Sequence, residues 1–290
     1  MVSIYIIAFY RFRSTLRCLH SLKKHLRSAY EVIVVENASA TEKQWTVYER
    51  LAKRWDQLKL VKLDRQRHCP WIRARVLKHA CGDYVFFMDN DCFVENDILP
   101  PLVSELQSDK RLGGISPALL YYPARTFQCL GIDLELSGNR LFHPKHLCHN
   151  EPYETQSHRK PFYSKFIPGG CSLFTRAFLE ECGYDDNFRN VFGDYDICLQ
   201  GGNLGWKYKF HPGCYVLHHK TRPDPLYVDA KARLTDWHGS VRLFEEKWRL
   251  RYFILEEIKA GRVIMDRSGF PQWLPRDSWP ENLNQAGGGP

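Results

Sequence analysis

The chain has 290 residues, of which 44% are hydrophobic and 14% aromatic, so it can bury a substantial core and is unlike a disordered protein. A formal charge of +8 suits phosphorylated ligands, an anionic membrane surface or nucleic acid, without selecting one of them. The ten cysteines include no Cys-x-x-Cys pair, the amino terminus lacks a signal-peptide pattern, and no apolar run is long enough to span a membrane. We therefore expect a reduced, cytoplasmic protein.

The first third of the chain alternates predicted strands and helices. The strands are expected at residues 2–9, 30–35, 58–63 and 84–88, and the helices at 15–26, 41–54 and 72–81. The first strand is nearly all apolar, which is typical of a parallel strand covered on both faces, and Ser14 is the expected N-cap of the helix after it. This alternation predicts an α/β fold with a mostly parallel central sheet flanked by helices.

Beyond residue 91 the pattern is less regular. Helices are expected at residues 98–107, 176–182 and 195–201, and a long C-terminal helix at 236–258. Strands are expected at residues 115–122 and 208–218, and within 166–174 a bend is followed by another strand. Between them, residues 123–161 are rich in His, Pro, Asn and Gly with little periodicity, which indicates an insertion that is mobile or contains hairpins.

Two aspartates follow the buried strand at 84–88. In an extended chain Asp89 and Asp91 share one face, with Asn90 on the other. Carboxylates at the carboxyl end of a buried strand lie where open α/β sheets bind ligands, and two hard oxygen donors suit Mg²⁺ or Mn²⁺ carrying a diphosphate. The alternative is a solvated turn, in which Asp and Asn are common.

Five further residues are candidates for a site. Glu36 ends the second strand and can accept from a ribose hydroxyl or a base, or belong to an ordinary turn. Arg73 and Arg75 precede the strand at 84–88 and have the fork geometry that matches phosphate oxygens. Asp194 is either a helix N-cap or a general base. His218 ends the last strand and can complete a metal site or be structural.

A separate cluster of possible metal ligands lies in the insertion. His143, His146, Cys148 and His149 are close enough in sequence to hold zinc. No second pair with matching spacing accompanies them, so a histidine-rich loop is the other interpretation. A Walker loop, a dinucleotide-binding glycine pattern, a zinc-protease helix and a Gly-x-Ser-x-Gly elbow are absent from the sequence.

The order of these motifs resembles that of family 2 glycosyltransferases of the GT-A fold, particularly the rhamnosyltransferase-like branch. The resemblance extends from about residue 2 to residue 220. It is carried by the stretches 2–11, 31–39, 82–85, 89–91, 168–170, 174–176, 183–188, 193–199, 205–207 and 216–219, together with Arg73.

The resemblance implies metal-assisted, inverting transfer of a sugar from a nucleoside-diphosphate sugar to a hydroxyl of a glycan, lipid-linked or protein acceptor. It assigns Phe9 and Glu36 to the nucleoside pocket, and Arg73, Asp89 and Asn90 to the binding of ribose or diphosphate. It assigns Asp91, Asp89 and His218 to the binding of Mn²⁺ or Mg²⁺, and Asp194 to the role of general base. Residues 1–235 would form the catalytic domain, with 1–91 binding the nucleotide sugar and 92–235 the acceptor, and 236–290 would be a C-terminal helix and tail.

The sequence departs from the family pattern at a few positions. Glu36 replaces the usual Asp, Ala74 and Gly193 replace an Asn and a Glu, and Tyr10 stands where Asn is more common. These departures favour one alternative, a catalytically degenerate GT-A domain that acts as a binding protein.

Two further functions are less well supported by the sequence. A sugar-nucleotide pyrophosphorylase needs a glycine-rich basic loop after the first strand, and a nucleic-acid binder needs a recognisable motif; the sequence has neither, so we expect no nucleic-acid partner. The basic, aromatic C-terminal helix has two interpretations, peripheral contact with an anionic inner membrane face or packing on the catalytic domain.

Overall fold

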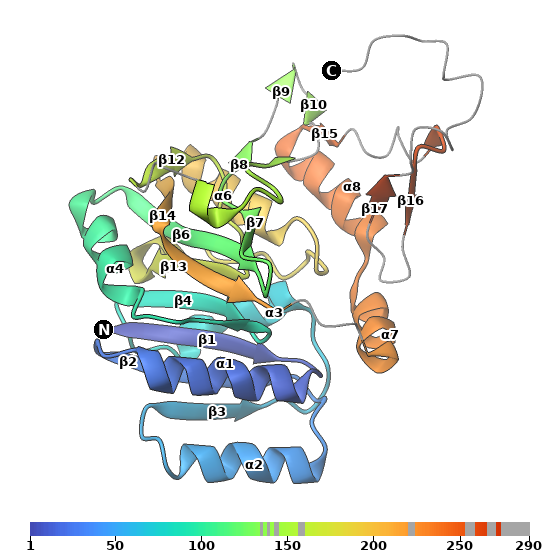
Figure 1. Ribbon diagram of the computed structural model, residues 1–290. Coiled ribbons are helices and arrows are strands. Elements are labelled where there is room, and N and C mark those ends of the chain that lie inside the picture. The colour runs from blue at the N-terminus through green and yellow to red at the C-terminus, as the bar shows by residue number, and fades with distance from the viewer. Residues whose placement is uncertain are drawn as a thin grey trace.

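A mixed sheet forms the centre of this computed structural model, which describes residues 1–133, 136–137, 140–141, 145–155, 160–219, 224–252, 259–265 and 271–273 (Figure 1). Within these residues the sheet has ten strands, eight of them in the order β12-β14-β6-β13-β4-β1-β2-β3, with β5 paired to β14 and β7 paired to β6. The strands are β1 (Val2–Ala8), β2 (Tyr30–Glu36), β3 (Leu58–Lys62), β4 (Tyr84–Asp89), β5 (Cys92–Phe93), β6 (Leu112–Tyr121), β7 (Thr126–Cys129), β12 (Phe162–Ser164), β13 (Cys171–Thr175) and β14 (Lys207–His218).

The long strands run in one direction with a single exception. Strands β4, β1, β2 and β3 are parallel to one another, and β14 is parallel to β6. Strand β13 lies between β4 and β6 and is antiparallel to both. As a result, the carboxyl ends of β1, β4, β6 and β14 and the amino end of β13 meet at one edge, which Figure 1 shows on the side of α7.

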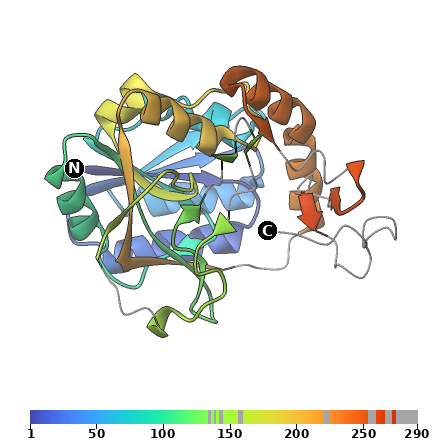
Figure 2. The same ribbon diagram turned by 90° about the horizontal axis from the view of Figure 1, so that it is seen from above.

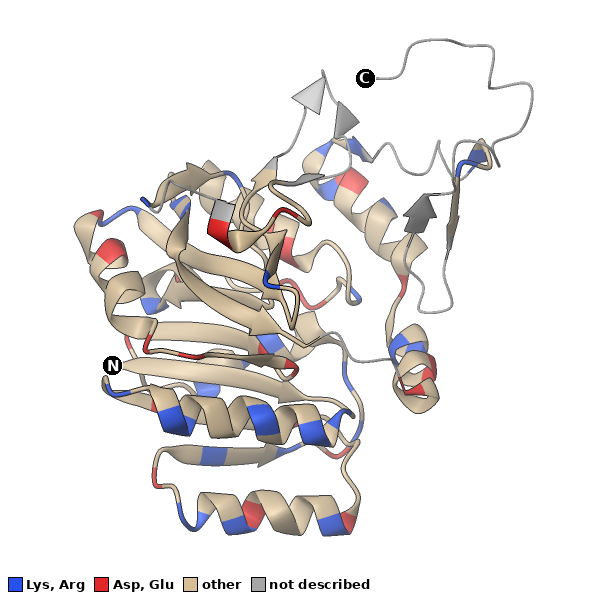
Figure 3. Ribbon diagram, in the orientation of Figure 1, with Lys and Arg blue, Asp and Glu red and all other residues tan. Residues whose placement is uncertain are grey.

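Helices cover both faces of the sheet, with α1 and α4 on one side and α5 and α6 on the other (Figure 2). The helices are α1 (Phe12–His25), α2 (Glu42–Ala52), α3 (Cys69–Arg73), α4 (Leu99–Ser108), α5 (Arg176–Glu181), α6 (Gly193–Asn203), α7 (Pro225–Leu234) and α8 (Trp237–Trp248), with short 3₁₀ turns at Val76–Lys78 and Tyr153–Thr155. Lys and Arg residues mark α1, and α2 carries both basic and acidic residues, whereas the central strands β1, β4 and β6 are almost uncharged (Figure 3).

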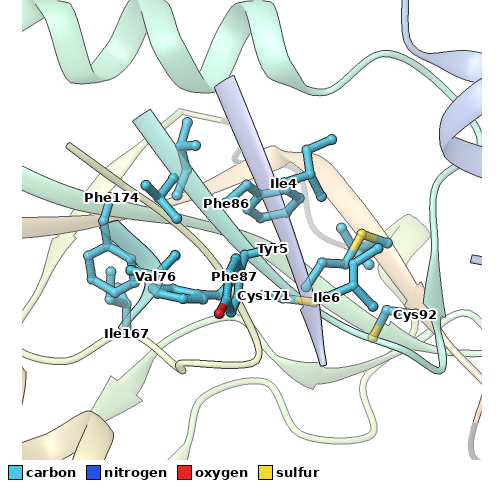
Figure 4. Packing of buried hydrophobic residues seen from close by; sticks show 14 of the residues in the cluster. Ile4, Tyr5, Ile6, Val76, Phe86, Phe87, Cys92, Ile167, Cys171 and Phe174 are labelled. Atoms are coloured by element: carbon cyan, nitrogen blue, oxygen red, sulfur yellow. The ribbon is translucent and has the colours of Figure 1, made fainter. Parts of the chain in front are cut away.

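The apolar core fills both sides of β1 and β4. Ile4 pairs in register with Phe86, and Tyr5 with Phe87, and alternation along the strands puts the two pairs on opposite faces (Figure 4). The Phe87 ring makes edge contacts with Tyr5 at 5.9 Å and with Phe174 at 5.8 Å. This aromatic layer lies directly below Asp89, the next residue on the same face, and so supports the edge where the parallel strands end.

The insertion at 123–161 contains the hairpins that its composition indicated. Besides β7, its described strands are β8 (Ile132–Asp133), β9 (Leu136–Ser137), β10 (Arg140–Leu141) and β11 (Lys145–His146). Strand β8 pairs with β11 and β9 with β10, both antiparallel.

Three predicted helix boundaries are wrong. Helix α1 begins at Phe12 with Arg11 as its N-cap, because the left-handed Arg11 backbone lets its carbonyl accept from Ser14 and Thr15. The helix predicted at 72–81 is the short α3 followed by a 3₁₀ turn; it begins earlier because the His68 side chain caps it and a proline occupies its first turn. Helix α8 ends at Trp248 because Arg249 is left-handed.

Helix α7 is absent from the sequence prediction. Asp224 caps it by accepting from the backbone of Leu226, and Pro225 is its first residue. This Asp-Pro pair is a helix-start signal, and it places α7 beside the carboxyl edge of the sheet.

Helix α8 packs against α6 and Phe192 rather than standing alone. Phe244 lies 4.9 Å from Phe192 between ring centroids, and both Lys247 and Trp248 bond the fully buried Asp196 of α6. The aromatic face of α8 is thus used in packing. Beyond it, short strands are described at Arg251–Tyr252 (β15), Val263–Met265 (β16) and Pro271–Trp273 (β17). Across the described residues, every helix is too short or too polar to cross a membrane.

Candidate active site

A cavity of about 390 Å³ opens at the carboxyl edge of the sheet. Its walls include Phe9, Arg73, Asp89, Asn90, Asp91, Asp194 and His218, whereas the candidates Glu36 and Arg75 lie outside them. These residues come from the ends of β1, β4 and β14, from α3 and from the first turn of α6. The fold therefore brings together groups that are up to about two hundred positions apart in the chain.

Asp91 and His218 form one side of the cavity. Strand β5 pairs with β14 so that Cys92 faces His218, which places His218 Nε2 at 3.2 Å from Asp91 Oδ2. On the other side of the ring, His218 Nδ1 lies 2.6 Å from Gln128 Oε1, a contact that fixes the orientation of the imidazole.

The charges of this pair stabilise each other. Burial would raise the pKa of Asp91, but the hydrogen bond from His218 and the charge of Arg11 lower it overall. Burial would lower the pKa of His218, but the bond to Asp91 raises it overall. The structure therefore favours a carboxylate beside an imidazolium.

Arg11 is a second cationic partner of Asp91. Its Nη1 forms an ion pair with Asp91 Oδ2, and its guanidinium carbon lies 4.2 Å from the ring centroid of Tyr227 on α7. Tyr227 also packs against Phe9, with 5.8 Å between the ring centroids. Helix α7 thus closes this end of the cavity with an aromatic ring.

Arg73 organises the opposite side. Its Nη1 donates to Asp194 Oδ1 at 2.9 Å, and its Nη2 lies 3.8 Å from Asp89 Oδ1. The guanidinium rests against the rings of Phe87 and Tyr184, at 5.4 and 5.5 Å from their centroids. Arg73 is therefore held by the aromatic core and presents its fork to two carboxylates. The neighbouring Arg75 faces away and bonds Asp186 at 2.8 Å.

Asp194 is a cavity residue and not a helix cap. The N-cap of α6 is Phe192, whose side chain makes no capping hydrogen bond. Asp194 Oδ1 instead accepts from Arg73 and, at 3.4 Å, from the hydroxyl of Tyr184. About 40% of the Asp194 side chain is accessible, so it can be reached by a ligand in the cavity.

Asp89 has an unusual proton affinity. About half of the Asp89 side chain is accessible, but the walls of the cavity surround it and raise its pKa to about 6, with Asp91 and Asp194 adding to the increase and Arg73 opposing it. A titratable group shifted in this way inside a cleft is characteristic of functional sites.

Two glycines bring the backbone against these carboxylates. A Cβ on Gly169 would lie 2.0 Å from Asp194 Oδ1, and one on Gly170 would lie 2.3 Å from Asp89 Oδ2. The carbonyl of Gly170 also accepts from the Asp89 backbone at 2.8 Å. A side chain at either position would therefore displace the carboxylate that it faces.

The remaining predicted residues differ in their exposure to the cavity. Phe9 lines it, whereas Asn90 is mostly buried and its amide donates to Thr15 Oγ1 at 2.9 Å. Glu36 is only 1% accessible, and its Oε1 accepts from the backbones of Ser39 and Ala40 at 2.7 Å. The extra methylene of Glu, relative to Asp, lets it reach the amides of its own turn. Contact between Glu36 and a nucleoside stays a prediction.

The donor set fits a divalent cation in part. Asp91 and His218 converge on one point, while Asp89 is turned towards Arg73, and the described residues include no group of three His, Cys, Asp or Glu that could hold a metal by themselves. Magnesium and manganese sites of nucleotide enzymes commonly use one or two protein ligands and complete the shell with phosphate and water. Asp91 and His218 suit that arrangement.

The proposed zinc cluster gains no support. His143 lies outside the described residues, as does the side chain of His146. His149 Nδ1 contacts the Gln128 carbonyl at 3.1 Å. Whether zinc binds here stays an open prediction.

Among the polar and aromatic residues of the cavity wall, sequence reasoning missed Arg11, Tyr227 and Lys231, and it also missed Gln128, which contacts His218. The sequence did contain a feature that could have identified Arg11, since this residue follows the first strand at the ligand-binding edge. Tyr227 and Lys231 are four positions apart on α7, whose Asp-Pro start was visible. No feature of the sequence could have identified Gln128, because its role depends on the pairing of β7 with β6.

A larger cavity, of about 620 Å³, lies near the carboxyl end of α6. Its walls are mainly apolar and include Phe166, Leu199, Trp206 and Tyr208. It contains none of the predicted site residues, so the smaller polar cavity is the candidate active site.

Comparison with known proteins supports this assignment. The model of the family described as "Glycosyl transferase family 2" matches residues 3–183. Human polypeptide N-acetylgalactosaminyltransferase 15 is 27% identical over 196 residues, covering 63% of this chain and 30% of the relative. Mouse polypeptide N-acetylgalactosaminyltransferase 6 is 24% identical over 258 residues, covering 82% of this chain and 40% of the relative. This chain thus spans well under half the length of either relative.

Solved structures share the fold. GalNAc-T7 with UDP, GalNAc and Mn²⁺ superposes with a TM-score of 0.63 at 18% identity, covering 89% of this chain and 56% of that chain. The mannosyltransferase PcManGT of Pyrobaculum calidifontis, in complex with GDP-Man and Mn²⁺, gives 0.55 at 17% identity, covering 80% and 60%.

The sequence relatives are N-acetylgalactosaminyltransferases and not rhamnosyltransferases, so they do not support the branch suggested by the motifs. They do support the family and its fold. Because the family model covers more than half of the chain and the solved structures share its fold, this protein belongs to glycosyl transferase family 2 and has the GT-A fold.

Proposed function

We propose that the protein is an inverting glycosyltransferase that moves a sugar from a nucleoside-diphosphate sugar to an acceptor hydroxyl, with Asp194 as the general base. The supporting observation is the position of Arg73, which bonds Asp194 and lies beside Asp89 in the cavity that also contains Asp91 and His218. A candidate base and a candidate diphosphate site are thereby held on two sides of one small space.

Inversion needs the acceptor to attack from the face opposite the leaving nucleotide. Asp194 is accessible at the cavity wall, away from the Asp91 and His218 pair, and its carboxylate can take the proton of an acceptor hydroxyl. Arg73 fixes the orientation of Asp194 through the 2.9 Å bond. The bond uses only Oδ1, so it leaves the second carboxylate oxygen available to an acceptor.

The leaving diphosphate develops negative charge, and the cavity contains cations that can stabilise it. Arg11, Arg73 and Lys231 all line its walls. Asp91 and His218 would hold Mn²⁺ or Mg²⁺, with Asp89 towards the diphosphate. A bound cation would act as a Lewis acid for the departing phosphate oxygens.

For the donor, we propose UDP-GalNAc as the first compound to examine. This choice is supported by the names of the sequence relatives and by the UDP and GalNAc in the structure of GalNAc-T7. We assign residues 1–91 to the donor and residues 92–235 to an acceptor, which can be a glycan, a lipid-linked sugar or a protein.

The test measures donor binding and sugar release in one set of proteins. The wild-type protein is screened with UDP-, GDP- and dTDP-sugars and Mn²⁺, with melting temperature reporting binding and nucleotide release reporting transfer to water or to added acceptors. Asp194→Asn should reduce nucleotide release by about 100-fold or more while its melting shift with donor is retained. Asp186→Asn, a matched change at a carboxylate outside the cavity, should behave as wild type.

The same measurements also distinguish the proposed transferase from the main alternative, a degenerate binding domain. A degenerate domain that binds sugars without transferring them is favoured by one observation, the Arg11 ion pair at the predicted metal position. Donor binding without release by the wild-type protein would support that alternative. Full activity of Asp194→Asn would overturn the assignment of the base.

A further inference from the structure

Arg11 occupies the position at which a cation would act on Asp91. Its Nη1 and the Nε2 of His218 both approach the same oxygen, Asp91 Oδ2. The carboxylate is well enclosed, with 4% of its side chain accessible, against 15% for Arg11. In the described structure the charge of Asp91 is therefore already neutralised by side chains of this chain.

The main chain prevents Arg11 from leaving by a backbone movement. Its carbonyl accepts from the amides of Ser14 and Thr15 and so starts α1, while its φ of 48° and ψ of 41° put it in the left-handed region. Only the side chain can rotate away from Asp91. Within the described part of the chain the guanidinium is paired with the carboxylate of Asp91 and lies against the ring of Tyr227, so rotation has to break one ion pair and one ring contact.

Arg11 also has a hydrogen-bonding group that is not used. Its Nε is buried and lacks a partner among the described residues. A guanidinium with a spare donor is ready to exchange one anion for another, since its fork matches phosphate as well as carboxylate.

A divalent cation at the oxygen of Asp91 would be repelled by the guanidinium of Arg11, which already contacts that oxygen. A divalent ion bound to Asp91 Oδ2 would stand within a few ångströms of the Arg11 charge in a poorly hydrated site, where such repulsion is strong. We propose that Arg11 is the resident counter-ion of Asp91 and that a divalent cation has to displace it in order to bind. This inference rests on the proposed metal site, and it assigns to Arg11 control over the affinity of that site.

The experiment measures Mn²⁺ binding by calorimetry without nucleotide, so that it does not depend on activity. Arg11→Gln removes the competing charge and should lower the Kd for Mn²⁺ by at least about tenfold. Arg13→Gln is the matched control, because Arg13 lies exposed in the same first turn of α1 and the substitution removes the same charge. Its Kd should stay within about twofold of wild type.

Melting temperatures provide a second readout. Without metal, Arg11→Gln should melt below wild type because the buried Asp91 loses a partner, and Mn²⁺ should raise its melting temperature more than that of wild type. Arg11→Lys, which keeps the charge, should bind Mn²⁺ no more than about threefold more tightly than wild type.

The outcomes separate this inference from the proposed function. Equal affinities in wild type and Arg11→Gln, with binding lost in Asp91→Asn, would overturn the role of Arg11 and leave the metal site standing. Absence of Mn²⁺ binding in every protein would overturn both. An Arg13→Gln protein that gains affinity as much as Arg11→Gln would show a general charge effect and would also overturn the role of Arg11.

Discussion

Arg73 Nη1 lies 2.9 Å from Asp194 Oδ1, although the two residues are 121 positions apart. The contact joins α3, which belongs to the first half of the chain, to the start of α6 in the second. Both residues also face the cavity in which Asp89 lies. Arg73 therefore determines where the proposed base stands relative to the proposed diphosphate site.

Replacing Arg73 with lysine should reduce transfer. Lysine retains the charge but cannot contact Asp194 and Asp89 with one planar fork, so kcat/KM should fall by about 10- to 100-fold. Arg75→Lys is the control, since Arg75 bonds Asp186 and stacks on Trp71 outside the cavity. Steady-state kinetics on both variants test the idea, and an equal loss in the two would contradict it.

Adding a methyl group at Gly170 should impair donor binding while the fold stays intact. The new Cβ would lie 2.3 Å from Asp89 Oδ2, and the half-accessible Asp89 side chain can move aside. Gly170→Ala should therefore melt near wild type but bind donor at least about tenfold more weakly, because the Asp89 carboxylate is displaced.

Gly202→Ala is the matched comparison for that variant. A Cβ there meets nothing within 4 Å, and the residue lies inside α6. It should keep donor affinity and gain about 0.5 to 1 kcal/mol in unfolding free energy, because alanine loses less conformational entropy than glycine in a helix. Urea unfolding measures the stability of both variants, and a donor-binding assay measures their affinity for the donor. Unchanged donor binding in Gly170→Ala would argue against a role for Asp89.

Removing the charge of Lys247 should destabilise the junction of α6 and α8. Asp196 is fully buried, and Lys247 Nζ lies 2.9 Å from its Oδ1 and also 2.9 Å from Asp185 Oδ2. Lys247→Met leaves the buried carboxylate without its cation and should cost about 2 kcal/mol, measured by urea unfolding.

The double variant Asp196→Asn with Lys247→Met is the control for the charge. It removes both ions and keeps an amide that can bond Trp248 and Gln200, which Asp196 contacts at 2.9 and 2.6 Å. It should recover part of the loss. A double variant less stable than Lys247→Met would show that the carboxylate is stabilised by its other partners alone.

His68 should make stability depend on pH. Burial, together with the charge of Arg189, lowers its pKa to about 4, and its ring nitrogen accepts from the amide of Trp71 at the start of α3. In the unfolded chain a histidine binds a proton near pH 6.5. The contribution of His68 is therefore complete above about pH 6.5 and is lost as the pH falls towards 4, by roughly 2 to 3 kcal/mol.

His68→Asn tests this dependence, because asparagine can cap the helix but does not titrate. Its unfolding free energy should fall less steeply than that of wild type between pH 6.5 and 4. His20→Asn, at an exposed position of α1, should keep the wild-type slope. A His68→Asn protein with the wild-type slope would contradict the assignment.

Much of the fold could be predicted because its strands are continuous apolar runs that suit few different structures. The ends of β1, β2 and β4 were within one or two residues of prediction, and the residues at their carboxyl ends follow from the parallel geometry. Phe9, Asp89 and Asp91 in the cavity were accessible to this reasoning. The position of Asp194 came from the family resemblance, since a carboxylate in the first turn of a helix is more often a cap.

The rest depends on contacts between distant segments. The hydrogen bond that orients His218 needs β7 beside β6, and the ring over Arg11 needs α7 beside β1. Neither pairing leaves a periodic signal in the chain. Glu36 shows a local effect, since its own turn binds only one carboxylate oxygen, Oε1, while the buried Oε2 has no partner among the described residues.

The reversed direction of β13 has a mechanical consequence. Because β13 is hydrogen-bonded to β4 on one side and to β6 on the other, the two halves of the chain share one continuous sheet. They cannot swing apart as separate lobes around a bound sugar without breaking main-chain hydrogen bonds. The sheet therefore limits changes in the spacing between Asp89 and the start of α6, and under the proposed function any adjustment to acceptors of different sizes would have to come from segments outside the sheet, such as α7.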